Sequence, residues 1–207
     1  IEEETDWLKR IQTLEHGKES LDSASCSFGQ KIQTKTPFKW KNFLSAYIYK
    51  KELVQLQHTR DPLPRFEDIY HLIIYPIAKE AREIVEPALK SIARQPFPAE
   101  RLVVFLAVED RASNDIKQDI SNLEKEFKEK FFHIQTVFHP GDIKNEAKVK
   151  GANATYAAKE AVQFFKENKI PFENIIVSCF DADTIVSPQY FTCLTYYYMI
   201  TPERSQA

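Results

Sequence analysis

Residues 175–184 have the sequence Ile-Ile-Val-Ser-Cys-Phe-Asp-Ala-Asp-Thr, and this stretch decides how the rest of the chain is interpreted. Its apolar, β-branched beginning predicts a buried strand, which delivers two carboxylates, Asp181 and Asp183, to the strand end. Side chains at i and i+2 of an extended chain share one face, so both carboxylates can reach one point. Two hard oxygen ligands favour a divalent cation, such as Mg²⁺, that also binds a phosphate. The stretch therefore predicts a metal–diphosphate site.

The same pair of aspartates has a simpler interpretation. Acidic pairs at strand ends often do no more than organise a turn. Ser187 and Pro188 follow closely, as the N-cap and the first residue of a new helix would. On this alternative, Asp181 and Asp183 organise the passage from strand to helix and bind nothing. The stretch by itself leaves both interpretations open.

From Tyr70 onward, apolar strands alternate with amphipathic helices. Four apolar stretches predict strands at residues 71–77, 102–108, 134–138 and 175–180, and helical periodicity follows each of them. Pro87 is expected to bend or restart the first of these helices. Strands that are apolar throughout are buried on both faces. The pattern therefore predicts an α/β fold with a mostly parallel sheet and helices on both faces.

Residues 1–66 are less clearly patterned, and we expect them to form an N-terminal extension before a domain at residues 67–207. Thr5 is a candidate cap for a short helix that ends at Gly17. Residues 38–56 fit either a strand or a helix. The predicted division of the chain rests on this contrast in patterning.

The composition limits the classes of protein to which this chain can belong. The 207 residues are 43% hydrophobic, enough for a substantial core, and 13% aromatic, which argues against disorder. A net charge of −2 gives no basic field, so we expect no nucleic-acid partner. No apolar run in the sequence is long enough to span a bilayer. The three cysteines lack metal-type spacing and indicate a reducing compartment, hence a cytoplasmic location.

Polar residues follow each of the four predicted strands. Taken alone, each could be an ordinary surface charge or helix-terminal residue. In a parallel sheet, however, these strand ends share one edge, so the groups can converge. Gly141 and Gly151 bracket the lysine segment, as expected of a backbone that needs unusual dihedrals or approaches a ligand. The candidates are Pro76, Ala78 and Glu80 after the first strand, Glu109, Asp110 and Arg111 after the second, Lys148, Lys150 and Gly151 after the third, and Asp181 and Asp183 after the fourth.

The order of these motifs resembles the nucleotide-binding half of family 2 glycosyltransferases, which have the GT-A fold. The resemblance covers about residues 68–200. IIYPIAKE is similar to that family's Pro-Thr-Tyr-Asn-Glu-type ending, VVFLAVEDR to its acidic second strand end, and FDADT to its Asp-x-Asp metal motif. KVKGANATYAAK resembles its Lys-Gly-x-x-x-Asn helix opening, with Thr155 where Asn is more usual.

This resemblance implies a site for a nucleotide-sugar donor, most often a UDP-sugar, with Mg²⁺ or Mn²⁺. It implies that Asp110 or Glu109 binds the base and that Glu80 lies on the ribose side. Lys148 or Lys150 would bind the nucleotide, and Asp183 would hold the metal, with Asp181 on the ribose side or the metal side. The nucleotide-binding set implied in this way is Pro76, Ala78, Glu80, Glu109, Asp110, Arg111, Lys148, Lys150, Gly151 and Asp181.

The resemblance also implies parts that this sequence does not show. Inverting members need a carboxylate base, which they carry after the Asp-x-Asp half. The chain stops at Ala207, so we expect the base beyond it and name no catalytic residue. We expect a truncated domain that binds the donor but transfers little sugar alone. For the longer protein we expect membrane association at the cytoplasmic face, a glycan or lipid-linked acceptor, and a role in polysaccharide biosynthesis.

Two other functions stay open. A haloacid-dehalogenase-type phosphohydrolase also places Asp-x-Asp after an apolar strand, with Asp181 as nucleophile and Asp183 as acid/base. In that class, Thr or Val is found two residues after the second aspartate, where this chain has Ile185. The motif also usually lies at the start of its domain, whereas three strand–helix units precede it here. The other alternative is a non-catalytic nucleotide-binding module, which only the activity of the longer protein would distinguish.

Overall fold

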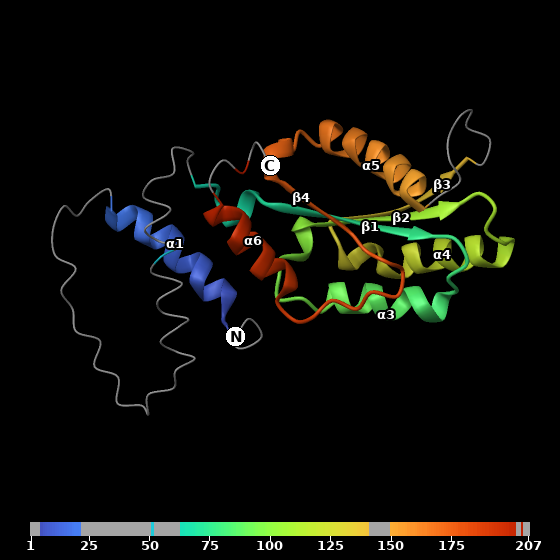
Figure 1. The fold of residues 1–207 in the computed structure, drawn as a ribbon, viewed down its shortest axis with the longest axis horizontal. Coiled ribbons are helices and arrows are strands. Elements are labelled where there is room, and N and C mark those ends of the chain that lie inside the picture. Colours follow the sequence, from blue (N-terminus) through green and yellow to red (C-terminus); the bar gives the residue numbers. More distant parts are fainter. Residues whose placement is uncertain (1–4, 22–50, 52–62, 141–149, 202–203, 205–207) are drawn as a thin grey trace, which may run out of the picture. The chain divides into compact units, whose positions relative to one another are not determined.

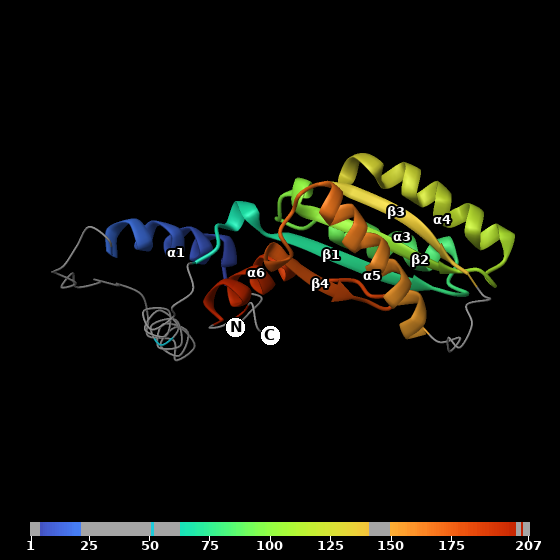
Figure 2. The ribbon, with the colours of Figure 1, turned by 90° about the horizontal axis from the view of Figure 1, so that it is seen from above.

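Helices cover both faces of a four-stranded parallel sheet. The computed structural model describes residues 5–21, 51, 63–140, 150–201 and 204. Viewed from above, the strands follow the order β3-β2-β1-β4 (Figure 2), and their three pairings are all parallel. The predicted α/β fold with a parallel sheet is confirmed. The strands are β1 (Tyr70–Ile77), β2 (Leu102–Glu109), β3 (His133–His139) and β4 (Ile175–Cys179).

The direction in which the chain crosses the sheet decides which face each helix covers. Helices α3 (Arg82–Ala93) and α4 (Asn114–Phe127) lie on one face, and α5 (Lys150–Glu167) lies on the other (Figure 1). Connections between parallel strands are almost always right-handed. The chain steps from β1 to β3 in one direction and then returns past β1 to β4. The third connecting helix is therefore forced onto the opposite face.

The chain forms two compact units. One contains residues 68–191 and hence the whole sheet, and the other contains residues 1–67 and 192–207. The division at residue 66 that the sequence suggested stays a prediction. In the second unit, three residues of α1 (Trp7–Leu21) pack against the later part of α6 (Tyr190–Ile200). None of the helices in the described part of the chain is long and apolar enough to cross a membrane.

Helix α1 differs from the sequence-based expectation at both ends. It is Asp6, not Thr5, that occupies the N-cap, and its Oδ1 accepts a hydrogen bond from the Lys9 N–H at 3.0 Å. Asp is the stronger cap of the two. The helix also continues through Gly17, because one glycine costs about 1 kcal/mol and does not by itself end a helix. Apart from Lys51, residues 38–56 lie outside the described part of the chain.

Helix α3 runs through Pro87 as one element, so the expected restart is wrong. Pro87 removes a hydrogen bond to the carbonyl of Glu83, but both residues are exposed and water can donate to that carbonyl.

The first residue of the helix, Arg82, is held by an ion pair with another helix. Arg82 donates to both carboxylate oxygens of Glu126 on α4, at 2.8 and 2.7 Å, and to Glu86 at 3.1 Å. This two-pronged ion pair joins α3 to α4.

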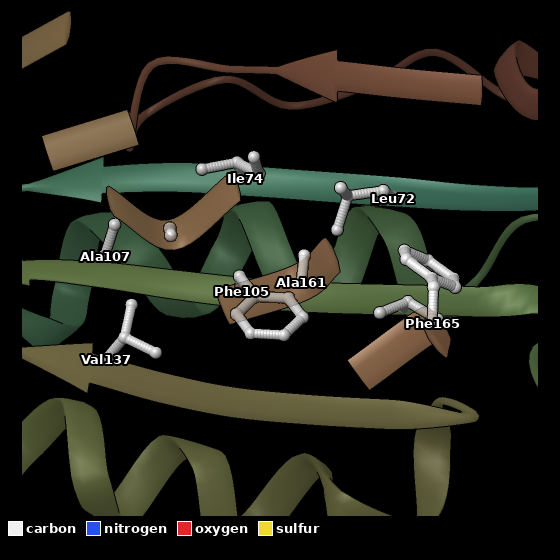
Figure 3. Close-up of a cluster of buried hydrophobic side chains, with 9 residues drawn as sticks. Leu72, Ile74, Phe105, Ala107, Val137, Ala161 and Phe165 are labelled. Carbon is white, nitrogen blue, oxygen red and sulfur yellow. The ribbon is translucent and has the colours of Figure 1, made fainter. Parts of the chain in front are cut away.

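The core on the α5 side is an interface between small helical residues and apolar strand residues (Figure 3). Ala157 and Ala161 of α5 are fully buried, and Phe165 is 1% exposed. The two alanines let the helix approach the strands closely, and Phe165 fills the space at one end of the contact. The strand residues of this cluster are Leu72, Ile74, Val103, Phe105, Ala107 and Val137.

The tight contact at Ala161 generates a stability prediction. Ala161→Leu forces extra atoms against the strands and should lower the free energy of unfolding by about 1–3 kcal/mol. Val162→Leu is the matched control, because Val162 is 41% exposed on the same helix and its change should stay within about 0.5 kcal/mol. Urea denaturation of the three proteins measures both effects. Equal midpoints for the two variants would show that the interface is looser than described.

His71 of β1 makes the stability of the sheet unit depend on pH. Its ring lies 4.7 Å from Phe97 and 4.9 Å from Phe191, between ring centroids, and burial lowers the pKa of His71 to about 3. Below the ordinary histidine pKa of 6.5 the unfolded chain binds a proton that the folded chain excludes. The stability contributed by neutral His71 is thus complete above pH 6.5 and is lost as the pH falls toward 3.

The slope of this loss is at most about 1.4 kcal/mol per pH unit. His71→Phe keeps an aromatic ring between its two neighbours and should remove this share of the acid sensitivity. Urea denaturation of both proteins between about pH 7 and pH 4 gives the comparison. The prediction is wrong if the two proteins lose stability in parallel.

Candidate functional site

The carboxyl ends of β1 and β4 lie side by side where the strand order reverses. Pairing of β1 with β4 ends at Ile74 and Cys179, whereas pairing with β2 continues to Ile77 and Val108. The last residues of β1 therefore extend beyond β4, and Pro76, which has no N–H to donate, falls among them. In open α/β sheets, ligands bind in the crevice at such a reversal.

A hollow at this crevice is lined by three carboxylates. Glu80 comes from the segment after β1, Asp181 and Asp183 come from the segment after β4, and Ile84 and Ala182 complete a cavity of about 240 Å³. Ala182 is 1% exposed, whereas both aspartates are exposed. The structure thus brings together the acidic residues that follow the first and the fourth predicted strands.

A tight turn after β4 presents the two aspartates. The Thr184 N–H donates to the Asp181 carbonyl at 2.9 Å, so Asp183 reaches the hollow from a turn and not from strand alternation. Strand β1 holds this turn on both sides. The Phe180 N–H donates to the Ile74 carbonyl at 3.0 Å, and the Tyr75 hydroxyl donates to the Thr184 carbonyl at 3.4 Å. These hydrogen bonds fix the turn through backbone groups and Tyr75.

Tyr75 is suited to this role because it is fully buried. Burial raises the pKa of Tyr75 above its usual range, so its hydroxyl stays protonated and remains a donor.

On the other side of the crevice, Glu80 folds back onto its own segment. Its Oε2 accepts hydrogen bonds from the N–H groups of Ala78 at 2.7 Å and Lys79 at 2.9 Å. Such charge-assisted bonds hold the carboxylate at the edge of the hollow.

The acidic end of β2 does not line this hollow. Glu109 is buried and forms an ion pair with Arg111, and this hydrogen bond raises the pKa of the Arg111 guanidinium. Asp110 is exposed and lies 3.2 Å from Lys117 Nζ. The structure therefore places Glu109 at the end of β2 and Asp110 just beyond it, and each lies beside a cation that follows it in the chain, Arg111 or Lys117 of α4.

The predicted lysine segment is described in part. Lys148 lies outside the described residues, and Lys150 is the first residue of α5. Gly151 is helical, has no positive φ, and has nothing within 4 Å of the place where a Cβ would be. The expectation that Gly151 serves an unusual dihedral is therefore wrong, since any residue could adopt its conformation. Gly141 lies outside the described part of the chain.

Asn153 is a buried polar residue to which the sequence analysis gave no role. It is 1% exposed, and its Nδ2 donates to the Ala107 carbonyl of β2. This hydrogen bond joins the first turn of α5 to the strand that ends in Glu109. The signal for it in the sequence is an amide among the apolar positions of a helix, where a buried polar group needs a partner.

The segment after the aspartates is a turn and not the start of a helix. The Tyr190 N–H donates to the Ser187 carbonyl at 3.2 Å, Gln189 has a φ of 65°, and α6 begins at Tyr190. The expectation that Ser187 caps a helix beginning at Pro188 is therefore wrong. Proline at the second position followed by a residue with positive φ is the pattern of a type II turn, which competes for the same sequence.

The donor set of the hollow fits the divalent ion that the motifs imply. Within the described ranges, no three His, Cys, Asp or Glu side chains come together closely enough to hold a metal ion. A closed protein cage, as structural zinc requires, is therefore not formed by these residues. Two carboxylates on one hollow suit Mg²⁺ or Mn²⁺, which completes its coordination with water and phosphate oxygens.

No protein-family model and no curated protein matches the sequence. Among solved structures, the chain shows distant structural similarity to the mannosyltransferase PcManGT from Pyrobaculum calidifontis, determined in complex with GDP-Man and Mn²⁺. The two chains are 16% identical, with a TM-score of 0.44. The match covers 75% of this chain and 42% of the mannosyltransferase, so this chain spans less than half the length of the structure that it matches.

Proposed function

We propose that this chain binds a nucleotide-sugar, specifically a UDP-sugar, together with Mg²⁺ or Mn²⁺, for transfer of the sugar to an acceptor hydroxyl. The observation that carries the proposal is the hollow beyond the carboxyl ends of β1 and β4, which is lined by Glu80, Asp181 and Asp183. Its acidic lining would repel a diphosphate, so a cation must lie between the two. The order of the strand-end motifs supports the same function.

The roles of the residues follow from their surroundings. Asp181 and Asp183 hold the ion, which when bound neutralises the charge that develops on a departing diphosphate. Glu80 fixes the segment after β1 and lies on the ribose side. Glu109 is buried beside Arg111, so the exposed Asp110 is the better acceptor for a base N–H. Among the described residues we assign no catalytic base.

The remaining parts of the proposal concern partners. The other proposed nucleotide contacts are Pro76 near the end of β1, Ala78 just after it, and Lys148, Lys150 and Gly151 before and within α5. The acceptor is proposed to be a glycan or a lipid-linked molecule, met at the cytoplasmic face of a membrane. No observation favours the phosphohydrolase alternative, which would show itself as a release of inorganic phosphate that is lost in Asp181→Asn.

Donor binding is predicted to need the metal. Calorimetry should show UDP binding in Mn²⁺ and much weaker binding in EDTA. Asp183→Asn removes one negative ligand at nearly constant shape. It should weaken the Mn²⁺-dependent affinity for UDP by about 10–100-fold or more, because the loss of a residue that only orients a metal ligand already costs that much. Asp119→Asn, on α4, is the matched control and should bind as the unchanged chain does. Equal UDP affinity in Mn²⁺ and in EDTA rules out the metal role.

Base selection is predicted at the end of β2. Asp110 can accept a hydrogen bond from uracil N3–H, a donor that cytosine lacks, and one such hydrogen bond contributes about 0.5–1.5 kcal/mol. UDP should therefore compete better than CDP, by about 2–10-fold, and Asp110→Asn should narrow the difference between the two affinities.

GDP belongs in the same competition, because guanine also presents N–H donors to a carboxylate. A preference for GDP that depends on Asp110 would keep the role of the carboxylate and change the donor. If Asp110→Asn leaves the relative affinities for UDP, CDP and GDP unchanged, the proposal that Asp110 binds the base is wrong.

A further inference from the structure

Two polar side chains at the end of α3 contact the segment that follows the aspartate turn. Ser91 lies in the last turn of the helix, and its hydroxyl donates to the Ala88 carbonyl at 2.7 Å and accepts from the Val186 N–H at 3.1 Å. Gln95 lies just beyond the helix end and contacts Ser187 and Tyr190. We call Ser91 and Gln95 together the α3 clamp.

The side-chain amide of Gln95 uses all of its hydrogen-bonding groups. Its Nε2 donates to the Ser187 carbonyl at 3.0 Å and to the Ser91 carbonyl at 3.1 Å, and its Oε1 accepts from the Tyr190 N–H at 3.0 Å. The opposite orientation of the amide would place its oxygen against two carbonyls, so these partners determine the orientation. Gln95 thereby bridges both ends of the turn formed by residues 187–190.

That turn needs such support. Gln189 has a φ of 65°, in the left-handed region that side-chain-bearing residues rarely adopt. Strained conformations of this kind persist where surrounding contacts over-determine them, and they cluster at functional sites. Here the bond from Tyr190 to Ser187 within the turn is reinforced at both ends by one glutamine. The contacts of Gln95 are thus matched to a strained bend.

The clamp lies close to the proposed metal ligands along the chain. Tyr75 holds the carbonyl of Thr184, the residue after Asp183, and Ser91 holds the N–H of Val186. Val186 is 7% exposed, so this end of the segment is also packed. The backbone that leaves Asp183 is therefore fixed within three residues, on one side by β1 and on the other by α3.

We propose that Ser91 and Gln95 are positioning residues for the metal site: they hold residues 186–190 so that the turn from Asp181 to Thr184 presents its carboxylates to the cation in one geometry. This inference rests on the proposed function of the two aspartates. A clamp that merely stabilises the fold would change stability alone. A positioning clamp also changes metal-dependent affinity, and does so through Asp183.

The test uses the full chain, UDP and Mn²⁺. Gln95→Ala and Ser91→Ala should each weaken Mn²⁺-dependent UDP affinity by about tenfold, the lower end of the loss for groups that orient metal ligands. Ser91→Thr keeps the hydroxyl and should restore most of the affinity. Gln163→Ala is the matched control, because the Gln163 amide bonds Glu167 within α5, and it should leave the affinity unchanged.

A double-mutant cycle separates positioning from general stability. In the Asp183→Asn background, Gln95→Ala should change the affinity by less than about twofold, because groups that act through one another are not additive. Hydrogen exchange of the Val186 and Tyr190 amides in the ligand-free chain reports the clamp without any metal. Protection of Val186 should fall in Ser91→Ala, and protection of Tyr190 should fall in Gln95→Ala.

The outcomes are distinguishable. Lost amide protection with unchanged affinity, or full additivity with Asp183→Asn, overturns the positioning role. Unchanged protection in both variants overturns the clamp itself. If Gln95→Ala does not fold, as judged by circular dichroism, the UDP affinities of Ser91→Ala and Ser91→Thr decide whether the positioning role holds. Failure of the unchanged chain to bind UDP with Mn²⁺ overturns the proposed function and the positioning role with it, whereas failure of the clamp shows in the variants alone.

Discussion

The right-handed connection between parallel strands is the constraint on which the rest of this structure depends. Since each crossover must turn the same way, α3 and α4 share one face of the sheet, and the return to β4 puts α5 on the other. The same return makes β4 a neighbour of β1. The carboxylates that line the hollow come from segments about a hundred residues apart, and this neighbour relation is what brings them together.

Electrostatic balance differs from one strand end to the next. At β2, Glu109 and Asp110 lie beside Arg111 and Lys117, so this edge is locally compensated. At β1, the charge of Glu80 is bound to two backbone N–H groups. After β4, the two aspartates lie on a turn whose hydrogen bonds run through backbone and a tyrosine. Three carboxylates line the hollow at the crevice, and their negative charge would attract a cation that brings its own phosphate ligands.

The periodicity of the sequence was enough to predict the elements of the sheet unit. All four strands and the helices between them lie where apolar spacing placed them. The expected burial on both faces holds for β1 and β2 but not for β4, which lies at the edge of the sheet and has Val177 58% exposed. The strand order left no local signature, since local patterns do not say which strands become neighbours. Asp6, Gly17 and Ser187 show a second limit: caps, glycines and turns have competing local solutions whose free energies differ by about 1 kcal/mol.

The sequence identified the charged residues of the candidate site but not the uncharged residues that hold them in place. Asp181, Asp183 and Glu80 stood out as acids at strand ends, and the structure places them around one hollow. The supporting residues are single polar side chains whose partners are far away in the sequence: Tyr75, Ser91 and Asn153 in ordinary strand or helix positions, and Gln95 just beyond a helix end. Their contribution depends on tertiary contacts that a one-dimensional pattern does not contain.

The contacts of Ser91 and Gln95 have a consequence for how this protein can diversify. Both side chains bond to the peptide groups of residues 186–190 and not to their side chains. These bonds therefore exclude proline, which lacks the N–H needed at Val186 and Tyr190, while the burial of Val186 and the ring contacts of Tyr190 restrict the two positions further. The exposed side chain of Ser187 takes no part in these bonds, so mutation at that position can alter which molecules the loop contacts while Ser91 of α3 and Gln95 just beyond the helix keep the backbone on its path.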